Sequence, residues 1–285
     1  MEAEKLIIKK PGNAYDITNL GAILFAKKLS DFERLSRKGV RVVSYEGKNR
    51  INTVREINGR QGYASGFQGL IGYINQSLPQ NEVISEALRK EIRMYPEIAI
   101  RELVANALIH QNFDISGTRP IVEIFSDRVE ITNPGTPLIE PDRFMDQPPR
   151  SRNESLAAFM RRASICEERG SGIDKVINVV EVFQLPAPSF KSIGSHTQAI
   201  LYAYKELSDM DREDKIRACY QHACLKFVSN EKMTNSSLRG RFSISPSNSS
   251  MASRIIRDTL SAGFVKVYDP NSSSKKHISY VPIWA

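Results

Sequence analysis

Residues 101–113 read RELVANALIHQNF, a run in which Glu102, Asn106 and His110 recur at intervals of four among apolar residues. Four residues advance an α-helix by about 40° beyond a full turn, so a helix here places the three polar side chains on one stripe. The apolar residues between them form a core-facing side. A carboxylate, a carboxamide and an imidazole are therefore presented to a common space.

These side chains have the chemistry of a phosphate site. Magnesium prefers oxygen ligands and keeps several waters, so the side-chain carbonyl of Asn106 is a reasonable magnesium ligand beside triphosphate oxygens. Glu102 lies one turn earlier, where a carboxylate can orient or deprotonate a water that attacks a γ-phosphate. The alternative is that the stripe is only a solvated helix face, which is a frequent arrangement of such residues.

Two motifs further along the chain carry residues that suit the same ligand. Gly170, Ser171 and Gly172 precede a helical pattern, and glycines at a helix start let backbone N–H groups approach phosphate oxygens, which the helix dipole attracts. Arg150 and Arg152 are placed to neutralise phosphate charge. The alternatives are an ordinary helix-entry loop and plain surface charge.

The elements that must position these residues follow from periodicity and turn residues. Pro96 opens the helix of the polar stripe, and two short strands follow it, IVEIF and RVEIT, closed by Pro134-Gly135. A long loop spans 136–155. The other expected elements are helices over Leu20–Leu29, 66–78 and Leu156–Arg162, strands over 40–47, 52–59 and 197–204, and a linker over 205–214.

In this order the motifs resemble those of the GHKL, or Bergerat-fold, ATPases. The shared pattern is E-x-x-x-N-A-x-x-H, a strand ending in N-P-G, an arginine-bearing lid, and E-x-G-S-G-I before a helix. Within that family, the chain is most similar to the divergent RecG-related ATP-binding regulators, which carry a Schlafen-type AlbA-like domain in front. That domain is absent here, so we expect the polypeptide to be a fragment of a larger protein. The resemblance spans roughly 15–205.

The resemblance implies a fold, cofactors and site residues. The fold is α+β, a Bergerat-type α/β sandwich with helices on one face of a mixed sheet. ATP and Mg²⁺ are the cofactors, with Glu102 catalytic and Asn106 holding the magnesium. The residues that bind the cofactor are Asn106, His110, Asn133, Gly135, Arg150, Arg152, Gly170, Ser171 and Gly172.

The adenine motif departs from the family pattern. GHKL proteins usually hold adenine with the aspartate of D-x-G-x-G, whereas this chain has Asn133-Pro134-Gly135-Thr136-Pro137. Asn133 can still hydrogen-bond an adenine amino group, but the carboxylate and the second glycine are missing. No GxxxxGK[ST] occurs in the sequence, which argues against a P-loop motor.

The last quarter of the chain has a different pattern. Helices are expected over Arg212–Phe227 and Thr234–Phe242, and a third begins at Ser245-Pro246, with Met251, Ile255 and Leu260 facing a core. Two strands around a polar turn complete a winged helix-turn-helix domain. From Asp211 onward there are twelve Lys and Arg against six Asp and Glu, a surplus that favours a polyanionic partner.

Double-stranded DNA is the expected partner of this domain. The side chains expected to contact DNA are Ser250, Ser253, Arg254 and Arg257 on the third helix and Lys275 and Lys276 in the turn. The alternative is a winged helix that serves only in dimerisation or protein contact. Cys219, His222 and Cys224 fall on different sides of a predicted helix, which disfavours a zinc site.

Composition limits the class of protein. With 285 residues, 41% hydrophobic and 25% charged, the chain suits a globular protein of two or three domains. We expect a cytoplasmic protein, since there is no long apolar span, no signal-peptide pattern, and an odd number of cysteines. The expected divisions are an α+β segment over 1–95, a GHKL-like domain over 96–205 and the winged helix over 206–285.

Three functions fit these expectations. The leading hypothesis is an ATP-binding, DNA-binding transcriptional regulator in which the nucleotide alters how the winged helix or a homodimer partner is presented. The second is an ATP hydrolase acting on nucleic acid, with Glu102 as the base. The third is a degenerate scaffold that has lost its nucleotide and binds protein.

Overall fold

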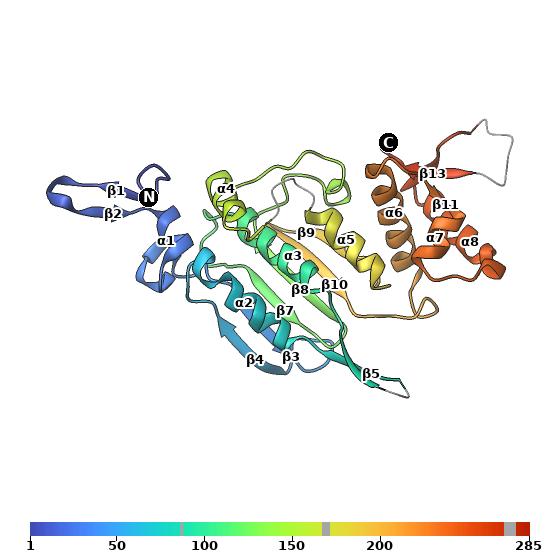
Figure 1. Cartoon of the computed structure of the whole chain (residues 1–285), viewed down its shortest axis with the longest axis horizontal. Helices are drawn as coiled ribbons and strands as arrows, with labels where there is room; N and C mark the ends of the chain where they lie inside the picture. Colours follow the sequence, from blue (N-terminus) through green and yellow to red (C-terminus); the bar gives the residue numbers. More distant parts are fainter. Residues whose placement is uncertain (86–87, 167–171, 271–277) are drawn as a thin grey trace.

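A computed structural model describes the chain except for residues 86–87, 167–171 and 271–277 (Figure 1). The helices are α1 (Asn19–Phe25), α2 (Tyr63–Ser77), α3 (Glu97–His110), α4 (Glu154–Arg162), α5 (Gly172–Val182), α6 (Arg212–Val228), α7 (Asn235–Arg241) and α8 (Ser249–Ser261). The strands are β1 (Ile7–Lys9), β2 (Tyr15–Ile17), β3 (Arg41–Tyr45), β4 (Thr53–Asn58), β5 (Gln80–Ser85), β6 (Leu88–Arg93), β7 (Ile121–Ile124), β8 (Arg128–Pro134), β9 (Ser189–Ile193), β10 (His196–Tyr202), β11 (Met233–Thr234), β12 (Val265–Val267) and β13 (Ser279–Pro282). None of the helices in these described ranges has the length and apolar character needed to cross a membrane.

A six-stranded sheet in the order β4-β3-β7-β8-β10-β9 is the centre of the larger part of the chain. β3 and β7 pair in parallel, and the other neighbours are antiparallel, so the sheet is mixed, as expected. Helices α2, α3 and α5 lie across one face (Figure 1). Val42, Val122 and Ile131 point from that face into a core that also contains Leu6 and Ala203. Residues before 96 therefore share one sheet and one core with 96–205.

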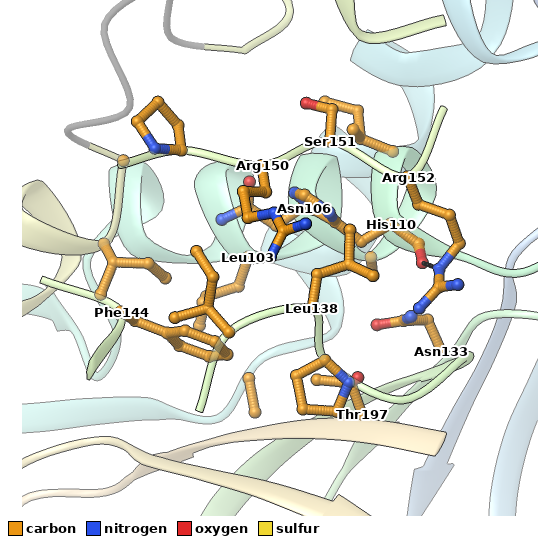
Figure 2. Close-up of a pocket in the computed structure, with 18 of the residues that line it drawn as sticks. Leu103, Asn106, His110, Asn133, Leu138, Phe144, Arg150, Ser151, Arg152 and Thr197 are labelled. Atoms are coloured by element: carbon orange, nitrogen blue, oxygen red, sulfur yellow. Dashed lines mark hydrogen bonds between the residues drawn. The ribbon is translucent and has the colours of Figure 1, made fainter. Parts of the chain in front are cut away.

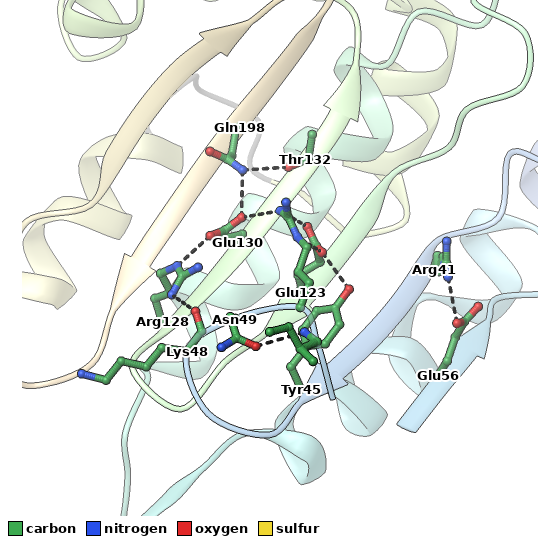
Figure 3. A network of polar contacts seen from close by, with 12 residues as sticks. Arg41, Tyr45, Lys48, Asn49, Glu56, Glu123, Arg128, Glu130, Thr132 and Gln198 are labelled. Atoms are coloured by element: carbon green, nitrogen blue, oxygen red, sulfur yellow. Dashed lines mark hydrogen bonds and ion pairs between the residues drawn. The ribbon is translucent and has the colours of Figure 1, made fainter. Parts of the chain in front are cut away.

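The opposite face of the sheet is polar (Figure 3). Glu123 and Glu130 are directly opposite each other on β7 and β8, and both are buried. Like charges in that position repel, but Arg50 bonds both carboxylates, at 2.7 and 3.0 Å, and Arg128 lies 2.6 Å from Glu130. These ion pairs hold the loop between β3 and β4 against the sheet.

The carboxy-terminal part is a separate small unit of three helices, α6 to α8, and a sheet in the order β11-β13-β12. The expected helices are present, although the third starts at Ser249 after a 3-10 turn over Pro246–Asn248. Ile255 is buried, as expected, and Leu260 is partly buried against the same core. The prediction for Met251 was wrong: it is 44% exposed, because the buried face of α8 runs through Ala252, Ile256 and Thr259 and position 251 lies outside it.

Three features were not predicted from the sequence. Two are hairpins that project from the body, β1–β2 and β5–β6, and the third is the edge strand β9 (Figure 1). The expected helix over Leu20–Leu29 is also shorter, because it ends at Phe25. Neither hairpin has the regular apolar–polar alternation by which strands are recognised, because the strands read IIK and YDI in the first and QNEVIS and LRKEIR in the second.

Candidate functional site

The polar stripe lies on α3, as its spacing predicts. Glu102 is 5% exposed, whereas Asn106 and His110 are half-buried. The helix begins at Glu97, with Pro96 at its N-cap. Burial, reinforced by the charge of Arg152, lowers the pKa of His110, so the imidazole is neutral at pH 7. A neutral imidazole offers one donor and one acceptor to a ligand.

A cavity of about 200 Å³, here called the α3 cavity, lies over this stripe (Figure 2). Its walls are α3, the ends of β8 and β10, the start of α5, and the loop over 136–152, here called the lid. Seven of the predicted site residues line it: Glu102, Asn106, His110, Asn133, Arg150, Arg152 and Gly172. Segments far apart in the sequence thus converge on one space.

The start of α5 requires a glycine at position 172, because a side chain there would collide with the polar stripe of α3. A Cβ placed on it would lie 2.9 Å from a carboxylate oxygen of Glu102 and 3.9 Å from the amide nitrogen of Asn106. The backbone of α5 therefore approaches the polar stripe as closely as a glycine permits. Gly170 and Ser171 lie outside the described residues.

Gly135, predicted to bind the cofactor, does not line the cavity and instead forms the turn that follows β8. Its φ of +111° suits a glycine, and an added Cβ would lie 3.1 Å from the backbone nitrogen of Asn112. Its N–H donates to the carbonyl of Ser195 at 2.7 Å, and its carbonyl accepts from the Thr197 hydroxyl at 2.7 Å. This turn brings Asn133, which is buried, and Thr197, which is partly buried, to the same end of the cavity (Figure 2).

The two lid arginines differ in their partners. Arg152 donates from Nε to the carbonyl of His110 at 3.1 Å and from Nη2 to the carbonyl of Thr136 at 2.6 Å. It therefore fastens the lid to the last turn of α3, whose carbonyls have no helical partner. Arg150 is exposed and, within the described part of the chain, forms no hydrogen bond or ion pair. Its guanidinium is thus available to a ligand.

Other cavity residues were missed by sequence reasoning. Arg161, in the last turn of α4, adds a third arginine, and Phe144, Phe190 and Leu138 form an apolar end. The Phe144 and Phe190 rings pack edge to face, with centroids 5.5 Å apart. Phe144 lies in the lid, where no periodic pattern marks its direction. Arg161 lies four residues after Ala157, which also lines the cavity, so the helical spacing places both on one face of α4.

The lining accommodates a ligand of mixed character. Among the described residues that line the cavity, three are arginines and one, Glu102, is a carboxylate, so this polar end favours an anion. The aromatic and aliphatic end favours a flat apolar group. The oxygens of Glu102 and Asn106 are hard donors of the type that Mg²⁺ accepts.

Comparisons with known proteins agree with part of this picture. A family model described as "Putative ATP-dependent DNA helicase recG C-terminal" matches residues 117–201. This part of the chain resembles an ATPase-like family. The matched range includes Asn133, Arg150 and Gly172, and it begins after α3 ends at His110.

A solved structure resembles nearly the whole chain in fold. It is the crystal structure of the DIP2311 protein from Corynebacterium diphtheriae, with a TM-score of 0.59 at 16% sequence identity. The match covers 95% of this chain and 55% of that one, so the chain spans about half the length of the protein that it resembles. At this identity the likeness concerns the fold alone. No protein of curated function matches the sequence.

The residues expected to contact DNA lie on α8. Ser250, Ser253, Arg254 and Arg257 are all exposed. The Ser253 hydroxyl accepts a hydrogen bond from the side-chain amide of Asn235 at 2.9 Å, which ties α8 to α7. Lys275 and Lys276 lie outside the described residues.

Proposed function

We propose that the α3 cavity binds an adenine nucleotide together with Mg²⁺. The observation that carries this proposal is the convergence of four separate segments, each with a residue type suited to phosphate or metal, on one cavity. The match of residues 117–201 to an ATPase-like family supports it independently. Asn106 would hold the magnesium, and the backbone at the start of α5 would approach the phosphates.

The remaining lining residues suit the other parts of the ligand. Arg150 and Arg161 would neutralise phosphate charge, because both face the cavity. Asn133 and Thr197 would hydrogen-bond the base, and the apolar end formed by Phe144 would cover its ring. Arg152 contributes indirectly by holding the lid in place.

Asn106→Ala is expected to weaken binding of ATP and Mg²⁺ by about 1 to 3 kcal/mol, because the ligand loses a partly buried polar partner. Isothermal titration calorimetry of the full chain measures the change. Asn178→Ala is the matched control, since Asn178 is exposed on α5 and does not line the cavity. Equal affinities for Asn106→Ala and the wild type, or no binding by either, would contradict the proposal.

We further propose that the carboxy-terminal unit is a winged helix-turn-helix that binds double-stranded DNA. Three helices followed by a small antiparallel sheet have the order of that fold, and α8, the third helix, exposes two arginines and two serines on one face. A homodimer would let two copies of α8 read paired half-sites. The competing possibility is a unit that binds protein, as in the nucleotide-free scaffold.

Arg254→Ala or Arg257→Ala is expected to reduce the binding free energy by roughly 1 to 3 kcal/mol for a preferred duplex, and by less for random DNA. Replacing Lys275 and Lys276 together with alanine should weaken binding to all duplexes similarly. It should also reduce the slope of log affinity against log salt concentration by up to about 2. Fluorescence anisotropy on selected and random duplexes across a salt series separates the two effects. Lys191→Ala, an exposed change on β9, is the control. Absence of binding at low salt would favour the protein-contact alternative.

A further inference from the structure

A second cavity, of about 360 Å³, contains three arginines, Arg37, Arg41 and Arg119, and is here called the arginine cavity. The sheet assembles it. Arg41 begins β3 and pairs in parallel with Ile121 at the start of β7, and Arg119 lies two residues before that strand. Asn58, at the end of β4, is opposite Arg41. The start of β3, the approach to β7 and the end of β4 thus bring Arg41, Arg119 and Asn58 to the same end of the sheet.

Neutralising partners in this cavity are few. Arg41 Nη2 forms an ion pair with Glu56 at 2.8 Å (Figure 3), but its Nε is buried and has no hydrogen-bond partner in the described part of the chain. Arg119 Nη1 donates to the neutral side-chain oxygen of Asn58 at 2.6 Å. Arg37 is exposed and has no hydrogen bond or ion pair with any described residue.

The charges of the cavity therefore do not balance. Its lining holds three guanidinium groups and one carboxylate, that of Glu56. Burial, followed by repulsion from Arg37 and Arg41, lowers the pKa of Arg119, and the attraction of Glu56 is a smaller influence. A local excess of about two positive charges remains, which matches a phosphate group at neutral pH better than a carboxylate, which carries one charge.

Further donors and a path for a longer ligand lie beside the arginines. The Thr118 hydroxyl lines the cavity, 3.2 Å from His196 Nε2. A groove of about 1270 Å³ shares Arg37, Gly117 and Thr118 with the arginine cavity, and it also contains Arg34. The groove reaches Arg152, which lines the α3 cavity as well.

We propose that the arginine cavity binds the phosphate groups of a second ligand, separate from the ligand of the α3 cavity. Planar guanidinium groups present paired donors that match phosphate oxygens, and several of them around one space are typical of phosphate recognition. Two sources share this chemistry, a free polyphosphate and the backbone of a single-stranded nucleic acid that continues along the groove.

The test uses the full chain without magnesium. Inorganic pyrophosphate is titrated calorimetrically, and a 5′-phosphorylated oligothymidylate is titrated by fluorescence anisotropy at low salt. Arg37→Gln and Arg119→Gln are each expected to lower the affinity for the anion roughly tenfold, since each removes one charge-assisted contact. Arg37 is exposed and has no hydrogen bond or ion pair with the residues that the structure describes, so its replacement should leave the fold intact. Arg55→Gln, an exposed change on β4 outside the cavity, is the matched control.

Arg150→Gln separates this site from the α3 cavity, because Arg150 lines that cavity and not the arginine cavity, so the change should leave the affinity for pyrophosphate as it is. If only pyrophosphate binding depends on Arg37 and Arg119, the ligand is a free polyphosphate, and if oligonucleotide binding also depends on them, the ligand is a nucleic-acid backbone. Wild-type affinities in both variants of the arginine cavity, or loss of pyrophosphate binding in Arg150→Gln instead, would overturn the proposal. Failure of ATP to bind would leave this result unaffected.

Discussion

Glu181→Ala is expected to destabilise the chain by about 3 to 5 kcal/mol, because it removes one partner of a buried ion pair. Glu181 lies on α5, and its carboxylate is 3.0 Å from His222 Nδ1 on α6 and 3.5 Å from Arg241 Nε on α7. Arg241 is only 4% exposed. Burial lowers the pKa of Arg241 and the charge of Glu181 opposes that change, so removal of Glu181 leaves a buried guanidinium without a counter-charge.

Urea denaturation followed by circular dichroism measures this loss. Glu46→Ala is the control, since Glu46 is an exposed acid in the loop after β3. Glu181→Gln should recover only part of the stability, because it restores the hydrogen bond to His222 and not the charge. A loss below about 1 kcal/mol in Glu181→Ala would show that water solvates Arg241 at this interface, as it does at surface pairs.

If the chain hydrolyses ATP, Glu102→Gln is expected to keep the affinity for the nucleotide and to lower the rate of phosphate release by about 10²- to 10⁴-fold. The amide keeps the shape of the carboxylate, which packs against Gly172, but it cannot accept a proton from water. A malachite-green assay of released phosphate, together with calorimetry on the same variant, measures both properties.

Glu97→Gln is the matched control for this change, because it alters an exposed acid in the first turn of the same helix. Unchanged phosphate release in Glu102→Gln would rule out a general-base role for Glu102. No release by the wild type above the uncatalysed background would contradict the hydrolase alternative and leave a protein that only binds nucleotide.

Sequence patterns were sufficient for the parts of the fold with a strong period or a specific turn. The four-residue spacing of Glu102, Asn106 and His110 predicts a helix and the face that it presents, because the period belongs to the helix itself. The glycines at 170 and 172 predicted a helix start, and α5 begins at Gly172, whereas their approach to phosphate stays a prediction. Such features depend on neighbours in the sequence.

Contacts between distant segments could not be predicted in this way. The attachment of Arg152 to the carbonyl of His110 at the end of α3 depends on where the lid crosses that helix, and nothing near position 152 in the sequence determines it. The same holds for Phe144, whose ring reaches Phe190 across the cavity. Arg41 and Arg119 are 78 positions apart and meet only because β3 and β7 pair in parallel.

Helix α5 touches the α3 cavity at Gly172 and the carboxy-terminal unit at Glu181. A ligand that moved α5 at Gly172 would therefore also move Glu181 relative to His222 and Arg241. Such coupling is reciprocal, because the factor by which a nucleotide changes the affinity of the unit for its partner equals the factor by which the partner changes the affinity for the nucleotide. One titration, repeated with and without the other ligand, would thus measure communication in both directions.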